Sequence, residues 1–212
     1  MKKLSPKDLK ELSEKTLNHY NETAPSFWEG TKDHDVSQNY QTFLSALEKS
    51  FGKGKSLSIL DFGCGPGRDL LYFKKLGHHP TGLEGSPVFA EMAQNFSHCP
   101  VLLQNFLNLN LASNTFHGIF ANASLFHVPR QELPRVLNNL FSALIPKGIL
   151  FSSNPRGDVE GWIGNRYGTY MELDLYKKYL EGSGFKILHH YYRPKGNPFE
   201  EQPWLAVVSK KI

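Results

Sequence analysis

A turn of alternating glycines follows a short apolar run that ends in an acid, in the stretch LDFGCGPGRDLLYFKKLG from residue 60. Gly63, Gly65 and Gly67 have no Cβ, so the turn can adopt positive φ and a ligand can press on bare backbone. The helix expected after the turn offers free N–H groups and a partial positive charge. These features predict a nucleotide-like ligand at the end of this strand, beside Asp61 and Cys64.

The spacing of the glycines separates this turn from two commoner nucleotide turns. A dinucleotide turn reads G-x-G-x-x-G, which would put its third glycine at position 68, where the chain has Arg68. A phosphate-binding loop reads G-x-x-x-x-G-K-[ST], and the sequence does not contain it. The pattern is instead D-x-G-x-G-x-G.

Short apolar runs alternate with amphipathic segments from residue 57 onward. Strands are expected at 57–62, 79–84, 100–106, 115–124, 147–154, 186–194 and 204–211, and helices at 67–77, 86–96, 130–145 and 174–185. This alternation predicts a parallel sheet with helices on both faces. Ligands of such sheets lie beyond the carboxyl ends of the strands, where the strand order reverses.

The first fifty residues are expected to be helical in two pieces. Ser5, followed by Pro6 and Asp8, has the pattern of a helix start. A broken, aromatic stretch is expected at 20–35, and an amphipathic helix follows it, with its apolar face at Val36, Tyr40, Phe43, Leu44 and Leu47. We therefore expect residues 1–52 to form a helical cap or extension and residues 53–212 to form the main domain.

Composition limits the class of protein. Hydrophobic residues make up 40% of the chain, which is typical of a globular protein, and no apolar run approaches the length of a membrane span. The net charge of +4 comes without a concentrated basic stripe, so no nucleic-acid partner and no membrane are expected. Two cysteines and the absence of an export signal predict a reduced, cytoplasmic protein, either monomer or homodimer. His34 between two aspartates has no established ligand spacing, so no metal is expected.

Several motifs in the same order resemble the class I S-adenosylmethionine-dependent methyltransferases. The resemblance covers about residues 57 to 209, and LDFGCGPG is its most specific part. GLEGSP, NASLFHVP, LFSALIPKGILFSSNP and LYKKYLEGSGFKILHHY resemble the later motifs of that family. The resemblance implies a three-layer α/β/α sandwich, with a mostly parallel, doubly wound, Rossmann-like sheet of seven strands and an antiparallel last strand. A glycine turn that serves only helix–sheet packing is the alternative interpretation.

The resemblance also implies how S-adenosylmethionine is bound. Asp61 would hold its amino-acid end, and the turn at Gly63, Cys64, Gly65 and Gly67 would lie against its methionine and ribose. Glu84, at the end of the second strand, would accept hydrogen bonds from both ribose hydroxyls. The remaining expected contacts are Gly85 and Ser86 under the adenosine, Asn105 at the adenine amino group in place of the family's usual acid, Phe106 as an apolar wall, and Asn122 at the methionine end. A role only as a helix cap is the alternative for Ser86.

The acceptor side is less well defined, because methyl transfer needs alignment more than a fixed catalytic set. His127 is the candidate base or orienting group, or else it packs against Phe126. Tyr20 or Trp28 could close over the sulfonium by cation–π contact. The candidate substrate-binding residues are His34, Asn39, Asn154, Arg156, Trp162, Tyr170 and Arg193, each of which could instead serve packing or anchor a loop.

The function expected from these observations is methyl transfer from S-adenosylmethionine to a small molecule at N, O or S by in-line displacement. Two alternatives remain open. One is a methyltransferase that acts on RNA or protein, and the other is a regulatory module that binds S-adenosylmethionine without turnover.

Overall fold

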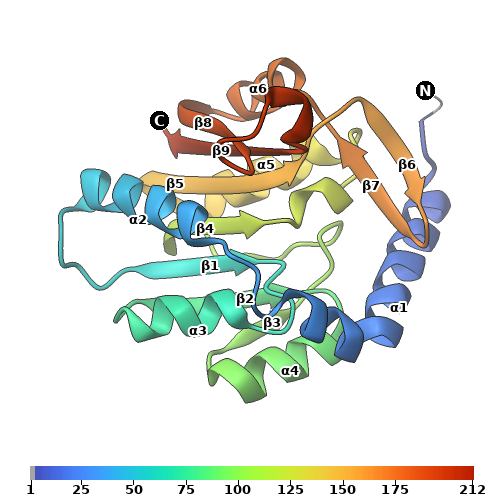
Figure 1. Ribbon diagram of the computed structural model, residues 1–212, viewed down its shortest axis with the longest axis horizontal. Helices are drawn as coiled ribbons and strands as arrows, with labels where there is room; N and C mark the ends of the chain where they lie inside the picture. Colours follow the sequence, from blue (N-terminus) through green and yellow to red (C-terminus); the bar gives the residue numbers. More distant parts are fainter. Residues whose placement is uncertain (1–2) are drawn as a thin grey trace.

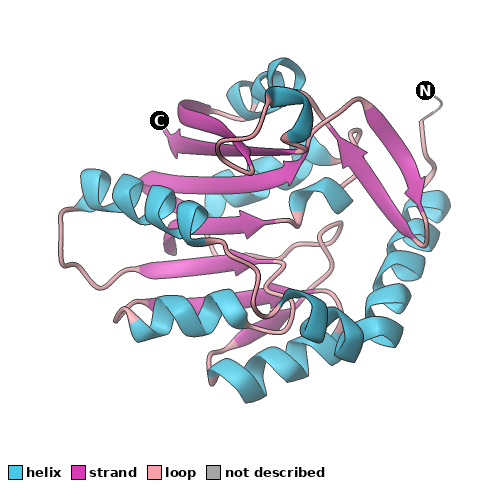
Figure 2. Ribbon diagram, in the orientation of Figure 1, coloured by secondary structure: helices cyan, strands magenta, loops and turns pink. Residues whose placement is uncertain are grey.

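A seven-stranded sheet with helices on both faces forms the body of the molecule (Figures 1 and 2). The computed structural model describes residues 3–212. The strand order is β3 (Val101–Leu103), β2 (His79–Glu84), β1 (Ser58–Phe62), β4 (Phe116–Asn122), β5 (Leu144–Pro155), β9 (Trp204–Lys211) and β8 (Phe185–Arg193). The pairs from β3 to β5 are parallel, and β9 is antiparallel to both of its neighbours. The predicted α/β sandwich with an antiparallel last strand is confirmed.

Two layers of side chains attach the helices to the sheet. One face carries α2 (Ser37–Phe51) and α3 (Arg68–Lys75), and the other carries α5 (Leu133–Ala143) and α6 (Leu173–Gly182). The expected apolar stripe of α2 is confirmed, because Phe43 and Leu47 are almost fully buried against the sheet. Burying such a side chain contributes about 1.5–3 kcal/mol. The helix α4 (Pro87–Ser97) packs beside α3.

The carboxyl ends of the parallel strands therefore meet at one edge of the sheet. In Figure 1 the arrowheads of β1, β4 and β5 all point toward α1, which runs beyond that edge. The division into a cap at 1–52 and a domain at 53–212 stays a prediction. The helix α2 belongs to the expected cap by sequence, yet it shares a core with the sheet.

The helix α1 (Pro6–Thr31) differs from its prediction as a broken segment. It starts as expected, with Ser5 and Asp8 forming a reciprocal cap, but it continues through Pro25 without interruption. Proline removes one backbone hydrogen bond and normally breaks or kinks a helix. Here Ala24 is fully buried, and the ring of Phe27 lies 5.1 Å from that of Phe89 on α4. Tertiary packing on both sides of Pro25 thus holds the helix.

The glycine-rich insert after β5 is a β-hairpin. Its strands β6 (Val159–Ile163) and β7 (Arg166–Tyr170) pair antiparallel, with Gly161 opposite Gly168. The hairpin stands between the sheet and α1, and β7 contacts that helix (Figure 1). It thus helps to position α1 over the sheet edge. None of the helices within residues 3–212 combines the length and apolar character needed to cross a membrane.

Candidate active site

The three glycines of the turn after β1 have three different neighbours. All have positive φ, at 77°, 51° and 95° for Gly63, Gly65 and Gly67. A Cβ on Gly63 would lie 2.5 Å from that of Ser124, and a Cβ on Gly67 would lie 2.8 Å from the Cα of Ala93. A Cβ on Gly65 would meet only Phe27, at 4.0 Å. Gly65 therefore leaves backbone open to a ligand, whereas Gly67 lets α3 approach α4.

Asp61 lies at the end of β1 with a carboxylate oxygen that lacks a partner. The side chain is 1% exposed, and its Oδ2 has no hydrogen bond within the described chain. Burial raises the pKa of Asp61 well above its ordinary value, and the nearby Asp69 carboxylate adds to the shift. An unpaired buried carboxylate is costly. The geometry therefore fits a cationic ligand group next to Asp61.

Glu84 joins the end of β2 to the glycine turn. Its Oε1 accepts hydrogen bonds from the backbone N–H groups of Gly85 and Ser86, at 2.8 and 2.9 Å, and its Oε2 accepts one from Gly65 at 3.0 Å. Burial raises the pKa of Glu84, and these three bonds oppose that shift. A carboxylate has about four lone-pair sites, so it can also accept from a ligand diol.

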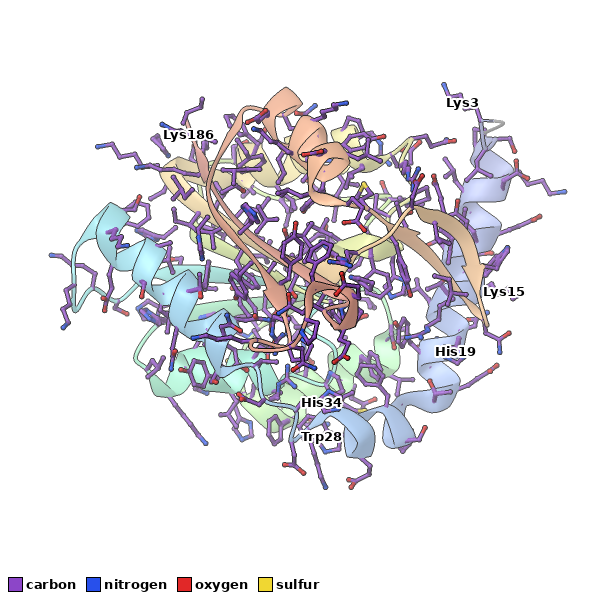
Figure 3. The ribbon with its side chains drawn as sticks, turned by 45° about the horizontal axis from the view of Figure 1, so that its top comes forward. Lys3, Lys15, His19, Trp28, His34 and Lys186 are labelled. Carbon is purple, nitrogen blue, oxygen red and sulfur yellow. The ribbon has the colours of Figure 1, made fainter. Side chains whose placement is uncertain are left out.

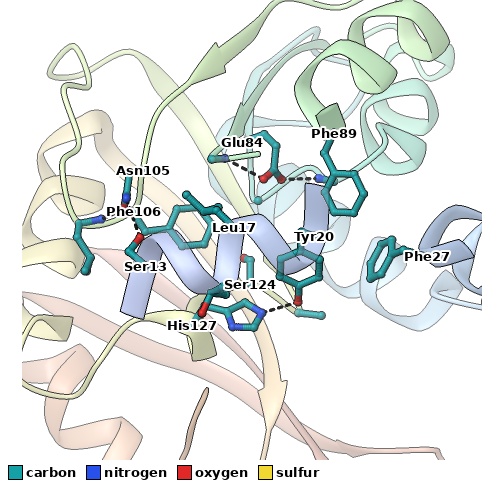
Figure 4. A pocket seen from close by; sticks show the side chains of 16 residues that line it. Ser13, Leu17, Tyr20, Phe27, Glu84, Phe89, Asn105, Phe106, Ser124 and His127 are labelled. Carbon is teal, nitrogen blue, oxygen red and sulfur yellow. Dashed lines mark hydrogen bonds between the residues drawn. The ribbon is translucent and has the colours of Figure 1, made fainter. Parts of the chain in front are cut away.

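The first cavity lies between this edge and α1, with an empty volume of about 650 Å³ (Figure 4). Glu84, Asn105 and Phe106 line it from the sheet side, and Leu17 and Tyr20 line it from α1. The predicted cofactor residues Gly63, Gly65, Glu84, Gly85, Asn105, Phe106 and Tyr20 are all among its walls.

Four side chains of α1 reach across to four different segments around the first cavity. Ser13, Thr16 and Tyr20 are three and four positions apart and so lie on one face of the helix, and Asn21 flanks that face. The pairs are Ser13 Oγ with Asn105 Nδ2 at 2.7 Å, Thr16 Oγ1 with Tyr167 N at 3.0 Å, Tyr20 Oη with His127 Nε2 at 2.7 Å, and Asn21 Oδ1 with Ser86 Oγ at 2.6 Å. This helix therefore closes the cavity by polar contacts that are far apart in sequence.

His127, the predicted base, uses both ring nitrogens. Its Nδ1 lies 2.7 Å from the carbonyl oxygen of Tyr167, and its Nε2 lies 2.7 Å from the hydroxyl of Tyr20 (Figure 4). A carbonyl can only accept, so Nδ1 carries the proton and Nε2 accepts from Tyr20. Burial lowers the pKa of His127 to about 4 and raises that of Tyr20. The neutral imidazole therefore lies behind the tyrosine hydroxyl, in the η1 turn (Leu125–His127).

The second cavity adjoins the first and is wider, with an empty volume of about 1230 Å³. Both cavities share Phe27, Gly63, Gly65 and Ala123 in their walls, so they meet at the glycine turn. The predicted residues Trp28, His34, Cys64, Asn122 and Arg193 line the second cavity. Trp28 and His34 lie near each other at the end of α1 (Figure 3).

A polar network forms one wall of the second cavity. The carboxylate of Asp69 accepts from Tyr40 Oη at 2.5 Å, from Arg68 Nε at 2.7 Å and from Asn122 Nδ2 at 3.4 Å. Asn39 donates to Asn122 Oδ1 at 2.9 Å and is fully buried. Asn39 is thus not a wall of either cavity; it orients Asn122, which is.

Several predicted site residues lie outside both cavities. Among the cofactor candidates, Ser86 is a buried helix cap of α4 and Gly67 serves packing. Among the substrate candidates, Asn154 accepts from the backbone of Phe126, and the carbonyl of Tyr170 accepts from Arg130. The structure does not support ligand roles for these four residues.

Two larger side chains also point elsewhere. Arg156 stacks 3.5 Å from the ring centre of Phe199 in η2 (Phe199–Glu201). Trp162 is 47% exposed, with the ammonium of Lys15 lying 4.3 Å from its ring centre. Both were predicted to bind substrate, and both instead pack against neighbouring residues of the chain.

Some residues that line the two cavities were not predicted from the sequence. Arg68 and Asp69 follow the glycine turn directly, so their position at the start of the helix was a usable signal. Ser153 pairs in register with Asn122, and its buried hydroxyl has no partner in the described chain. Leu17 and Phe89, which also line the first cavity, look like ordinary core residues in the sequence. Within residues 3–212, no three His, Cys, Asp or Glu side chains gather closely enough to hold a metal ion.

Comparison with known proteins agrees with this geometry. A family model described as a methyltransferase domain matches residues 59–148. A Burkholderia thailandensis 1,6-didemethyltoxoflavin-N1-methyltransferase, solved with 1,6-didemethyltoxoflavin and S-adenosylhomocysteine, is 19% identical. The alignment covers 100% of this chain and 92% of the other, with a TM-score of 0.75.

Two further solved structures share the fold. A Leishmania major S-adenosylmethionine-dependent methyltransferase is 19% identical, with 97% of this chain and 85% of that chain covered and a TM-score of 0.77. The [4+2]-cyclase SpnF is 16% identical, with 94% and 96% covered and a TM-score of 0.70, so the fold alone also carries other chemistry. No curated protein matches the sequence significantly.

The family model adds a sequence match to the similarity in fold. The matched residues include the glycine turn, Asp61 and Glu84. Residues 59–148 thus match a methyltransferase domain, and the chain as a whole has the fold of S-adenosylmethionine-dependent methyltransferases of known structure.

Proposed function

We propose that this enzyme methylates a small molecule at an oxygen, nitrogen or sulfur atom. The observation that carries the proposal is the junction of the two cavities at Phe27, Gly63, Gly65 and Ala123. This junction lies under α1, so a group that reacts there is enclosed between the helix and the sheet edge. Such a space suits a small acceptor better than a folded RNA or protein. The structural relative that holds 1,6-didemethyltoxoflavin is consistent with this choice.

The cofactor is proposed to lie across both cavities. Its adenosine would occupy the first, with Glu84 accepting from the ribose hydroxyls and Asn105 and Phe106 beside the adenine. Its amino-acid end would occupy the second, where the guanidinium of Arg68 matches a carboxylate. The buried, unpartnered oxygen of Asp61 is not a wall residue of this cavity, but it interacts with the charges of Arg68 and Asp69 there and would match an ammonium. When bound there, S-adenosylmethionine supplies an activated methyl group on a sulfonium that leaves as a neutral thioether.

The chain's own contribution is alignment and exclusion of water. The rings of Tyr20, Phe27 and Phe89 lie 5.1–5.7 Å apart and wall the junction with apolar surface. Aromatic faces also attract a cation, so they favour the charged sulfonium there. Holding two reactants in line contributes about 7–11 kcal/mol toward lowering the barrier. These residues need no covalent step to promote methyl transfer.

The test is a transfer assay with S-adenosylmethionine labelled in its methyl group. The purified enzyme is incubated separately with a metabolite extract, total RNA and a protein extract. Label in the metabolite fraction supports the proposal, and Gly65→Val, which fills the junction, serves as the inactive control. Label only in RNA or in protein would replace the proposal with one of those substrates. Tight binding of the cofactor without transfer to any fraction would indicate a regulatory module.

A further inference from the structure

The contact between α1 and η1 contains a hydrogen-bonded pair whose orientation is fixed at both ends. Tyr20 Oη donates to His127 Nε2 over 2.7 Å, and His127 Nδ1 donates to the carbonyl of Tyr167 over 2.7 Å. Arg166 Nη1 donates to Tyr20 Oη from the opposite side over 3.3 Å. Both Tyr20 and His127 line the first cavity. The hydroxyl oxygen of Tyr20 therefore keeps acceptor capacity toward the ligand.

We propose that Tyr20 is the catalytic residue that receives the proton of the methyl acceptor, and that it passes its own proton to His127. The inference deepens the proposed function and rests on it. Both hydrogen bonds of the relay, from Tyr20 to His127 and from His127 to Tyr167, are already present. Only one more is needed, from the X–H group of the methyl acceptor to the free lone pair of Tyr20 Oη. Arg166 is a positioning residue, because its donated hydrogen bond leaves Tyr20 only one direction in which to accept.

The step balances in atoms and charge. The acceptor atom forms a bond to the methyl carbon as the carbon–sulfur bond breaks, and that electron pair stays on sulfur. The acceptor's proton moves to Tyr20 Oη, and the tyrosine proton moves to Nε2 of His127. One positive charge is lost at sulfur and one appears on the imidazolium, where the Tyr167 carbonyl accepts from Nδ1–H. The proton then returns to solvent after product release.

The charged surroundings decide which acceptors need this relay. Arg166 and Tyr170 face Tyr20 from β7, Glu84 faces it from β2, and His19 is its neighbour on α1. Burial and the charge of Arg166 lower the pKa of His127 to about 4, so the imidazole is neutral at pH 7 but a weak base. A weak base cannot ionise an alcohol in advance, yet it accepts readily from an oxygen or an amide-like nitrogen that becomes strongly acidic as it is methylated. The remaining lone pair of Tyr20 needs a group that still carries a proton, so the predicted acceptor is a hydroxyl or an N–H group rather than a thiolate.

The first test needs no acceptor. The ¹⁵N spectrum of the imidazole rings is recorded with S-adenosylhomocysteine bound, and His127 is assigned with His127→Gln. We expect a neutral ring protonated on Nδ1 from pH 8 down to about pH 5, with Nε2 shifted by an accepted hydrogen bond. Tyr20→Phe should move the Nε2 resonance. Tyr176→Phe, which removes a buried hydroxyl bonded to Ser152 instead, should not. A proton on Nε2 would overturn the relay, because that nitrogen could not then accept.

The second test measures transfer from labelled S-adenosylmethionine into the metabolite extract between pH 4 and 9. Tyr20→Phe should reduce the rate about a hundredfold, at the low end of general-base effects, while calorimetric affinity for S-adenosylhomocysteine changes less than about threefold. The wild-type rate should not change with pH above pH 6 and should decrease at lower pH, as His127 becomes protonated. The rate of Tyr20→Phe should not show this decrease. Equal rates for wild type and Tyr20→Phe would overturn the relay and leave the proposed function intact. No labelling by the wild type in any fraction would instead overturn the proposed function itself, and the relay with it.

Discussion

The two cavities under α1 are lined by different kinds of residue. The first is enclosed by aromatic and aliphatic side chains, with backbone N–H groups tied to Glu84. The second is almost twice as large in empty volume and contains a network of charges around Arg68 and Asp69. A mostly apolar space selects by shape, whereas paired charges select by charge distribution. The difference matches a ligand with a flat nucleoside at one end and a zwitterion at the other.

The comparison also separates what is local from what is distant in the chain. The part of the floor that both cavities share includes the turn that directly follows β1, at Gly63 and Gly65. The cover of the first cavity comes from α1, which reaches residues more than 60 positions away through each of its four polar contacts. The floor is therefore readable from a motif, and the cover is not.

The largest expected effect tests whether the cavities are one continuous site. Gly65→Val would place a branched side chain at the junction, where only Phe27 approaches a Cβ. We expect affinity for S-adenosylmethionine to fall more than about a hundredfold, equivalent to about 2.7 kcal/mol, in calorimetric titration. Gly54→Val is the matched control, since its φ of 72° imposes similar backbone strain with nothing within 4 Å. Equal losses in both variants would indicate backbone strain rather than a blocked junction.

The next effect tests the first cavity alone. Glu84→Gln keeps the shape of the side chain but removes the charge that ribose hydroxyls would meet. Hydrogen bonds to a charged acceptor contribute about 1.5–3 kcal/mol, so S-adenosylhomocysteine should bind about tenfold or more weakly. The 2′,3′-dideoxy analogue should bind wild type and Glu84→Gln with similar affinity, because it has no diol to lose. A tenfold loss for this analogue too would assign Glu84 only to ordering the turn.

Most of the fold was predictable from local sequence patterns. The pattern of alternating glycines, however, did not show that each glycine is needed for a different reason. The apolar spacing in α2 and the strand–turn–helix around β1 are properties of adjacent residues, so they were predicted correctly. The alternating glycines were also found, but their roles depend on Ser124, Ala93 and Phe27, which come from other elements. Sequence spacing carries no record of these neighbours.

The acceptor side was harder to predict for the same physical reason. Arg156 follows β5 at the correct edge of the sheet, yet it stacks on Phe199 in η2, 43 positions later in the sequence. Pro25 indicates a break in α1, but Ala24 and Phe27 pack well enough to keep the helix intact. In both cases a long-range contact decided the outcome.

A smaller effect, of opposite sign for stability and binding, tests the buried charge of Asp61, which interacts with two wall residues of the second cavity, Arg68 and Asp69. Asp61→Asn removes a buried, unpartnered charge, so the ligand-free protein should melt at a higher temperature than wild type at pH 7. The raised pKa of Asp61 means that wild-type stability is full below its ordinary value of about 4 and falls as pH rises through the raised value. Asp61→Asn should lose this fall in thermal melts from pH 4 to 8, whereas the exposed Asp33→Asn should not.

The same variant should bind S-adenosylmethionine several-fold more weakly if Asp61 meets the ammonium group. 5′-Methylthioadenosine lacks the amino-acid end, so its affinity should not change. Weaker binding of both compounds would mean that the substitution disturbs the turn rather than the second cavity.

The smallest effect tests whether α1 is a fixed wall or one that depends on each polar contact. Ser13→Ala removes the partner of Asn105 at the far end of the first cavity. A single hydrogen bond contributes about 0.5–1.5 kcal/mol net, so release of S-adenosylhomocysteine should quicken about two- to tenfold with little change in melting temperature. Ser26→Ala is the control, because that hydroxyl bonds only within α1, to the carbonyl of Thr23. Faster release confined to Ser13→Ala would make α1 a cover held by separable contacts, whereas equal release rates would make it a wall that packing alone holds in place.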